Sequence, residues 1–224
     1  MPQLGWHVNL DNCIACRACE AACKQEFDLP VGVRRRMVVV QEGVATNKPF
    51  RHHVTMACNH CATPACKAAC PVNRYWKDDG ATAESIALRT AFGMDANPTT
   101  GLVLIKPSVD DDPVNGVDCI GCKRCRSACP YGAPRFDEGS GTMDKCIGCY
   151  HRLYNQNLPP ERRKPACVVT CTALTLHFDD MTVIEGGAYG PANPTTGGPG
   201  GVKDIADPSL TNPSLRFAPQ TNIG

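Results

Sequence analysis

The sixteen cysteines of this 224-residue chain fall into four groups of four, and this grouping constrains the fold more than any other feature. The first and third groups share the spacing C-x2-C-x2-C-x3-C, and the second is spaced C-x2-C-x4-C-x3-C. The fourth group consists of two pairs with a longer loop between them. In chain order the groups are Cys13, Cys16, Cys19, Cys23; Cys58, Cys61, Cys66, Cys70; Cys119, Cys122, Cys125, Cys129; and Cys146, Cys149, Cys167, Cys171.

Sixteen thiolates match the ligand requirement of four [4Fe-4S] clusters, each of which takes four cysteines. A C-x2-C-x2-C loop turns tightly enough for three thiolates to bind three corners of one cluster. The fourth cysteine binds the neighbouring cluster in two-cluster ferredoxins. Pro71 and Pro130 directly follow the second and third groups, where a fixed φ ends the turn. The pattern therefore predicts a protein that binds four clusters and carries electrons along them.

Two other uses of cysteine fit this spacing less well. Structural zinc favours C-x2-C pairs about 15–20 residues apart or mixed sets of cysteine and histidine, and a tetrahedral site has no use for a third close cysteine. A disulfide framework suits a short secreted chain, and cysteines three residues apart rarely reach disulfide geometry with one another. A zinc-stabilised binding module, colourless and redox-silent, is the alternative from a different functional class.

The rest of the composition indicates no catalytic site. A formal net charge of +1 gives no sign of nucleic-acid binding. No GxGxxG sequence follows a predicted strand, so nothing indicates a nicotinamide or flavin site. His60 and His151 lie beside cysteines, and we expect them to contribute hydrogen bonds that tune a cluster rather than to act as ligands. We expect no catalytic residue in this chain.

Local patterns predict short strands and helices separated by long cluster-binding loops, which is an α+β fold. Hydrophobic alternation and flanking turn residues indicate strands, and a 3.6-residue apolar period indicates helices. The predicted strands are 4–10, Met37–Gln41 and Leu102–Lys106, and the predicted helices are Cys19–Phe27 and Ala81–Phe92.

The order of the cysteine groups suggests how the chain is divided. The second and third groups lie between the first and the fourth, as expected for one bacterial two-cluster ferredoxin-like unit inserted into another. We therefore predict two interleaved units, residues 1–45 plus 140–180 for the first and 46–139 for the second. Residues 181–224 form a predicted extended C-terminal tail rich in Gly and Pro. Such a tail is either disordered or laid along a partner, and we favour the partner.

The sequence leaves two routes open for location. No apolar run approaches the roughly 20 residues needed to cross a bilayer. Met1–Leu10 has no basic region, apolar core or twin arginine typical of a secretory signal. We expect either a cytoplasmic chain or export of the folded chain with a signal-bearing partner, because clusters must be inserted before export. The side of the membrane stays open.

Four stretches carry a resemblance to a known family: 13–24 (CIACRACEAACK), 58–66 (CNHCATPAC), 119–134 (CIGCKRCRSACPYGAP) and 144–149 (DKCIGC). In this order they resemble the four-cluster electron-transfer subunit of the molybdopterin oxidoreductases, which include dimethyl sulfoxide, polysulfide, thiosulfate and tetrathionate reductases. The resemblance covers roughly residues 4–180. It implies a conduit between a molybdenum- or tungsten-pterin catalytic subunit and a quinone-linked membrane anchor or another redox carrier.

The resemblance also implies a crossed ligand scheme, in which each cluster takes cysteines from two groups. Some relatives hold a three-iron cluster where a third-group cysteine is Trp, but Cys122 is present here and four [4Fe-4S] clusters are expected. The implied sets are Cys13, Cys16, Cys19 and Cys171 (first set); Cys23, Cys146, Cys149 and Cys167 (second set); Cys58, Cys61, Cys66 and Cys129 (third set); and Cys70, Cys119, Cys122 and Cys125 (fourth set). In the family the cluster of the first set lies nearest the catalytic subunit, and the cluster of the fourth set is the outlet towards a membrane anchor or a soluble partner.

The chain departs from the family pattern outside the ligands. Thr172 follows Cys171 where many relatives have Pro, and forty-eight residues separate Cys70 from Cys119. Insertions of this kind often build docking surfaces, so they bear on the partner. The run Arg34–Arg36 is either such a docking patch or an ordinary solvated face. A free-standing polyferredoxin or a hydrogenase-type electron-transfer subunit is the alternative within the same functional class.

Overall fold

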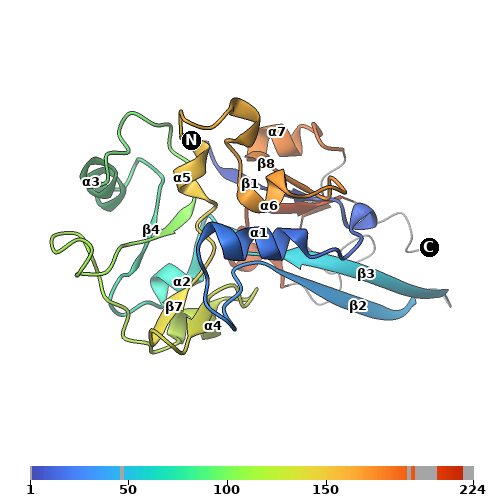
Figure 1. The fold of residues 1–224 in the computed structure, drawn as a ribbon, viewed down its shortest axis with the longest axis horizontal. Helices are drawn as coiled ribbons and strands as arrows, with labels where there is room; N and C mark the ends of the chain where they lie inside the picture. Colours follow the sequence, from blue (N-terminus) through green and yellow to red (C-terminus); the bar gives the residue numbers. More distant parts are fainter. Residues whose placement is uncertain (1, 46–47, 191–192, 195–205, 219–224) are drawn as a thin grey trace.

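The computed structural model describes residues 2–45, 48–190, 193–194 and 206–218, and it confirms an α+β fold of short elements (Figure 1). The helices are α1 (Ala18–Glu26), α2 (Ala65–Ala68), α3 (Ala83–Ala91), α4 (Arg124–Ala128), α5 (Tyr150–Leu153), α6 (Ala166–Val169) and α7 (Met181–Glu185), with 3-10 turns at Leu10–Asn12, Pro160–Arg162 and Pro208–Leu210. The strands are β1 (Leu4–Val8), β2 (Met37–Ala45), β3 (Lys48–Met56), β4 (Tyr75–Lys77), β5 (Val103–Ile105), β6 (Arg135–Asp137), β7 (Thr142–Asp144), β8 (Leu176–Asp180), β9 (Asn193–Pro194) and β10 (Leu215–Phe217).

A four-stranded sheet joins the two ends of the described chain. Its strand order is β8-β1-β10-β9, with β1 antiparallel to β8 and parallel to β10. The other paired strands form the antiparallel hairpins β2–β3, β4–β5 and β6–β7. In Figure 1 the long β2–β3 hairpin extends to one end of the molecule, and α3 lies at the opposite end. The cysteine-bearing helices α1, α2, α4 and α6 lie between these extremes.

The elements predicted from sequence are confirmed with small shifts at their ends. The strand at 4–10 is β1 followed by a 3-10 turn, and the helix at Cys19–Phe27 is α1. The helix at Ala81–Phe92 is α3, whose first turn is capped by the Thr82 hydroxyl accepting from the Ser85 N–H. The strand at Leu102–Lys106 is β5, and Met37–Gln41 is the start of the longer strand β2.

Contact of the C-terminal tail with a partner stays a prediction, but residues 206–218 are not a separate extended tail. These residues pack on their own chain, where Trp6 N–H donates to the Ser214 carbonyl at 2.9 Å and Phe217 pairs with Val8 across the sheet. Gly5 permits this close approach, because a Cβ there would lie 2.4 Å from the Ser214 carbonyl oxygen and 2.3 Å from the Met181 sulfur. The rest of 195–224 lies outside the described residues.

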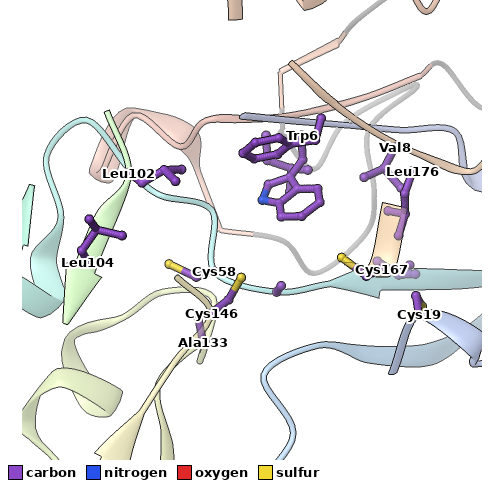
Figure 2. Packing of buried hydrophobic residues seen from close by; sticks show 14 of the residues in the cluster. Trp6, Val8, Cys19, Cys58, Leu102, Leu104, Ala133, Cys146, Cys167 and Leu176 are labelled. Carbon is purple, nitrogen blue, oxygen red and sulfur yellow. The ribbon is translucent and has the colours of Figure 1, made fainter. Parts of the chain in front are cut away.

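The main core mixes apolar side chains with cysteine sulfurs. Trp6 is 1% exposed and packs against Phe178 with 4.7 Å between ring centroids. Figure 2 shows that the cysteines of this core come from separate parts of the chain, with Cys58, Cys146 and Cys167 around the same interior as Trp6. Several of the cysteines therefore form part of the core itself.

We expect Phe217→Ala to destabilise the holoprotein by roughly 3–5 kcal/mol, because it removes a buried aromatic ring from β10 where that strand pairs with β1. The measurement is the midpoint of urea-induced bleaching of the cluster absorbance under anaerobic conditions. Leu210→Ala is the matched control, because Leu210 belongs to the same segment and is 63% exposed. Equal midpoints for the two variants would show that the segment does not stabilise the fold.

Candidate iron–sulfur centres

All four cysteine groups use the same backbone turn. The residue two positions after the first cysteine has a positive φ in each group, at Ala15 (55°), His60 (46°), Gly121 (65°) and Gly148 (70°). This turn directs the backbone N–H back toward the preceding sulfur: Gly121 N–H donates to Cys119 Sγ at 3.4 Å, and Gly148 N–H donates to Cys146 Sγ at 3.3 Å. N–H donors aimed at sulfur stabilise a thiolate that binds iron.

The first set joins cysteines that lie far apart in the sequence, from Cys13 to Cys171. Burial raises the pKa of the Cys13 thiol, and the nearby thiols of Cys19, Cys171 and Cys16 raise it further, against one lowering contribution from the Ala15 N–H. Cys13 and Cys16 lie in the loop that leads into α1, and Cys19 lies in the first turn of that helix. Cys171 follows α6, which packs on α1. The packing of these two helices therefore completes the set.

The second set is the most deeply buried. Burial raises the pKa of Cys23 to about 12, and the charges of Cys146 and Cys167 act in the same direction. Burial also raises the pKa of Cys149, with Cys146, Cys167 and Cys23 as its thiol neighbours. One cysteine of α1 thus meets three cysteines from the C-terminal part of the described chain.

The third set combines the second group with the last cysteine of the third group. Burial raises the pKa of Cys61 to about 11, and Cys58 and Cys129 add to the effect, although the Thr211 hydroxyl opposes it. Burial likewise raises the pKa of Cys66 to about 12, with Cys58, Cys129 and Cys61 contributing. Packing of α2 on α4 brings these two groups together.

The fourth set lies beside a second, smaller hydrophobic cluster that contains Tyr75, Val103 and Met143. Burial raises the pKa of Cys125, with Cys70 and Cys119 as its thiol neighbours and the Tyr75 hydroxyl donating to its sulfur at 3.3 Å. Backbone N–H groups add further donors to sulfur, from Arg74 to Cys70 at 3.4 Å and from Met143 to Cys119 at 3.3 Å. Cys122 is exposed at the turn of the same loop.

These surroundings fit [4Fe-4S] clusters. The donors are all thiols, they converge from distant segments, and N–H or O–H groups point at several of the sulfurs. Burial and mutual repulsion oppose free thiolates, so a cation has to replace the thiol protons. Among the described residues no group of three or more Cys, His, Asp or Glu side chains is arranged to hold one metal ion. In a cubane each cysteine binds a different iron atom, so convergence on a single point is not required.

The two histidines singled out from the sequence do different things. His60 is buried and its Nδ1 accepts from the Val103 N–H at 3.1 Å; burial lowers its pKa well below the usual value, so the ring is neutral. His151 lies 2.7 Å from Glu26 and stacks edge-on against Phe27. These partners place His151 in a polar network at the surface rather than at a sulfur.

Several polar residues at the cysteines have burial or contacts that the sequence did not indicate. Lys145 is fully buried, and its ammonium donates to the carbonyls of Val103 and of Cys146, the latter at 2.9 Å. Thr211 lies beside Cys61 and donates to the Tyr131 hydroxyl at 3.2 Å. The backbone of Ala62 donates to the Asn212 carbonyl at 2.8 Å. Residues 211–214 therefore cover the second cysteine loop, a role that their aperiodic sequence does not signal.

All-thiol sets of this kind define a multi-cluster, ferredoxin-type electron-transfer protein. A family model described as "4Fe-4S dicluster domain" matches residues 49–181, and one described as "4Fe-4S binding domain" matches residues 10–28. The chain therefore belongs to this 4Fe-4S family, within the iron–sulfur electron-transfer subunits of the molybdopterin oxidoreductases.

Three relatives illustrate the similarity. The chain is 29% identical to the B subunit of anaerobic dimethyl sulfoxide reductase from Haemophilus influenzae, over 97% of this chain and 92% of the relative. It is 33% identical to the protein of that name from Escherichia coli K12, over 79% and 73%. It is 31% identical to the formate dehydrogenase iron-sulfur subunit of Wolinella succinogenes, over 77% and 79%. Within the described part of the sequence, no helix is long and apolar enough to span a bilayer.

We expect Gly121→Ala to lower the iron content of the purified protein. Its φ is positive, which costs a residue with a Cβ about 1–2 kcal/mol, and the added Cβ would lie 2.6 Å from the Gly141 carbonyl oxygen. Gly93→Ala is the control, because Gly93 has the same φ sign with nothing within 4 Å of the added Cβ. Iron per chain is the measurement, and an equal iron content in the two variants would show that close packing of this turn is not needed.

Proposed function

We propose that the chain conducts electrons between a molybdenum- or tungsten-pterin catalytic subunit and a quinone-linked membrane anchor or another redox carrier. The proposal is supported above all by the crossed assembly of the cysteines, in which each set draws on two groups of the sequence. The names of the relatives, the B subunit of a reductase and the iron-sulfur subunit of a dehydrogenase, support a role beside a catalytic partner. The complex would be held at a membrane through such a partner.

The ligand scheme that we propose is the one given by the four sets. The neighbouring thiols of Cys13, Cys23, Cys61 and Cys66 all belong to the set of the cysteine concerned. A bound [4Fe-4S] cluster accepts and releases one electron at a time. In this scheme the chain holds each cluster by four thiolates, directs N–H groups at several of the sulfurs, and buries all four cysteines of the second set.

The sets follow one another in a row. Cys19 of the first set and Cys23 of the second are one helical turn apart on α1. Cys146 of the second set has Cys58 of the third as a close neighbour, which raises the pKa of Cys146 after the larger effect of burial. The third and fourth sets share the helix pair α2 and α4. Each set is therefore adjacent to the next, as a linear conduit requires.

The two ends of this row reach the surface. Cys16 of the first set and Cys122 of the fourth are exposed, and each lies in a loop with an exposed isoleucine, Ile14 at 67% and Ile120 at 63%. Exposed apolar side chains beside a redox centre suit contact with another protein. We assign the Cys16 end to the catalytic subunit and the Cys122 end to the anchor or carrier, in keeping with the family.

Replacement of Cys122 by Ser tests the conduit in the intact complex. We expect loss or conversion of one cluster and loss of turnover with the physiological electron partner. Turnover with an artificial dye that exchanges electrons directly with the catalytic subunit should persist. Ser127→Ala is the matched control, since Ser127 is exposed on the helix that follows the same loop. Full physiological turnover in Cys122→Ser would contradict the proposal.

The partner is tested by purification of the native protein under anaerobic conditions, followed by metal analysis. We expect one molybdenum or tungsten to accompany the iron of this chain. Iron without a pterin metal would instead favour a free-standing polyferredoxin or a hydrogenase-type subunit.

A further inference from the structure

The three arginines of the run Arg34–Arg36 do not form a common surface patch. The Arg34 side chain is half exposed and lies 3.6 Å from Glu20. Arg35 forms a two-point ion pair with Asp144 at 2.6 and 2.8 Å. Arg36 is 2% exposed, and its guanidinium carbon lies 4.4 Å from the centre of the Trp6 ring. Arg36 is thus a buried cation in the middle of the core.

The Arg36 charge has no carboxylate partner among the residues that the structure describes. Its guanidinium donates to the Thr55 hydroxyl at 3.1 Å, and its Nε is buried without an acceptor. A buried, unpaired guanidinium is costly, and stacking on an indole offsets only part of that cost. Arginine also stays protonated in proteins, so the charge cannot be lost instead.

Cysteine sulfurs surround this cation. Burial disfavours the charge, but Cys167, Cys146, Cys19 and Cys23 outweigh it and raise the pKa of Arg36. Three of these cysteines belong to the second set and Cys19 to the first. The guanidinium therefore lies between the two sets, and sulfurs that carry negative charge when they bind iron supply the missing counter-charge.

Arg36 also acts on the first set through a hydroxyl. Thr55 Oγ1 accepts from Arg36 and lies 3.6 Å from Cys19 Sγ. Because the hydroxyl oxygen already accepts from the guanidinium, its own hydrogen is free to be donated to the sulfur. Hydrogen bonds to cluster sulfurs favour the reduced, more negative form of a cluster.

A fixed positive charge has the same effect at short range. Reduction adds one negative charge to a cluster, and a cation in a water-excluded interior stabilises that added charge more than solvent at the surface does. The effect falls with distance, so the two sets around Arg36 should respond more than the third and fourth sets.

We infer that Arg36 raises the reduction potentials of the two clusters held by the first and second sets. It does so through its buried charge and through the Thr55 hydroxyl that it orients. The inference rests on the ligand scheme proposed above. It assigns to one arginine of a basic run a role in the interior that differs from those of its two neighbours.

Potentiometric titration of the intact complex, monitored by electron paramagnetic resonance, tests this inference. Cys16→Ser and Cys149→Ser identify the signals of the first and second sets. In Arg36→Gln we expect these two potentials to fall by at least a tenfold change in the one-electron equilibrium constant, or about 59 mV, with smaller changes in the other two. Arg36→Lys should restore most of the difference. Arg34→Gln is the matched control and should leave all four potentials unchanged.

Thr55→Val separates the hydroxyl from the charge. We expect it to lower the potential of the first set alone, because only Cys19 faces the hydroxyl. Unchanged potentials in Arg36→Gln, or an equal shift of all four, would overturn the inference. If Arg36→Gln fails to assemble clusters, Arg36→Met, which also removes the charge, carries the same test, and unchanged first- and second-set potentials in it would overturn the inference. Loss of one cluster signal in Cys16→Ser and of a different one in Cys149→Ser shows separately that the first and second sets each hold a cluster.

Discussion

The gathering of sixteen cysteine thiols, nine of them buried, is the constraint on which the rest of this structure depends. Helices as short as α2, α5 and α6, four residues each, are not stable alone in water. Each lies next to cluster cysteines, so ligation and packing hold it in place. Free thiolates would repel one another in such an interior, and their raised pKa values show that burial opposes their charge. Iron binding and folding are therefore coupled in this chain.

The crossed ligand scheme that we propose accounts for the joining of distant segments in this fold. In that scheme Cys171 has to reach the loop of Cys13 and Cys129 the loop of Cys58, and these thiols are near neighbours in the structure. The central sheet supports this arrangement, because β1 lies between β8 and β10. Buried cations then counter the negative charge collected inside. Arg36 acts between the first two sets, and Lys145 donates to the carbonyl of Cys146.

Much of the site could be predicted because cysteine spacing is a local signal. The positions of the ligand groups, the turns around Ala15 and Gly121, and helices α1 and α3 all follow from short stretches of sequence. Contacts between distant segments could not be predicted in this way. Thr211 has no motif that links it to Cys61, and Arg36 looks like one member of a solvated basic run. The placement of β10 beside β1 depends on tertiary packing that neither strand encodes alone.

Metal analysis of the anaerobically purified protein tests the central claim most directly. Iron, acid-labile sulfide and zinc would be counted per chain, with the iron of any partner subtracted. Four sets of four cysteines predict about sixteen iron and sixteen sulfide atoms per chain, with no stoichiometric zinc. About eight iron atoms would show that only two sets bind clusters. Zinc without iron would contradict the account as a whole.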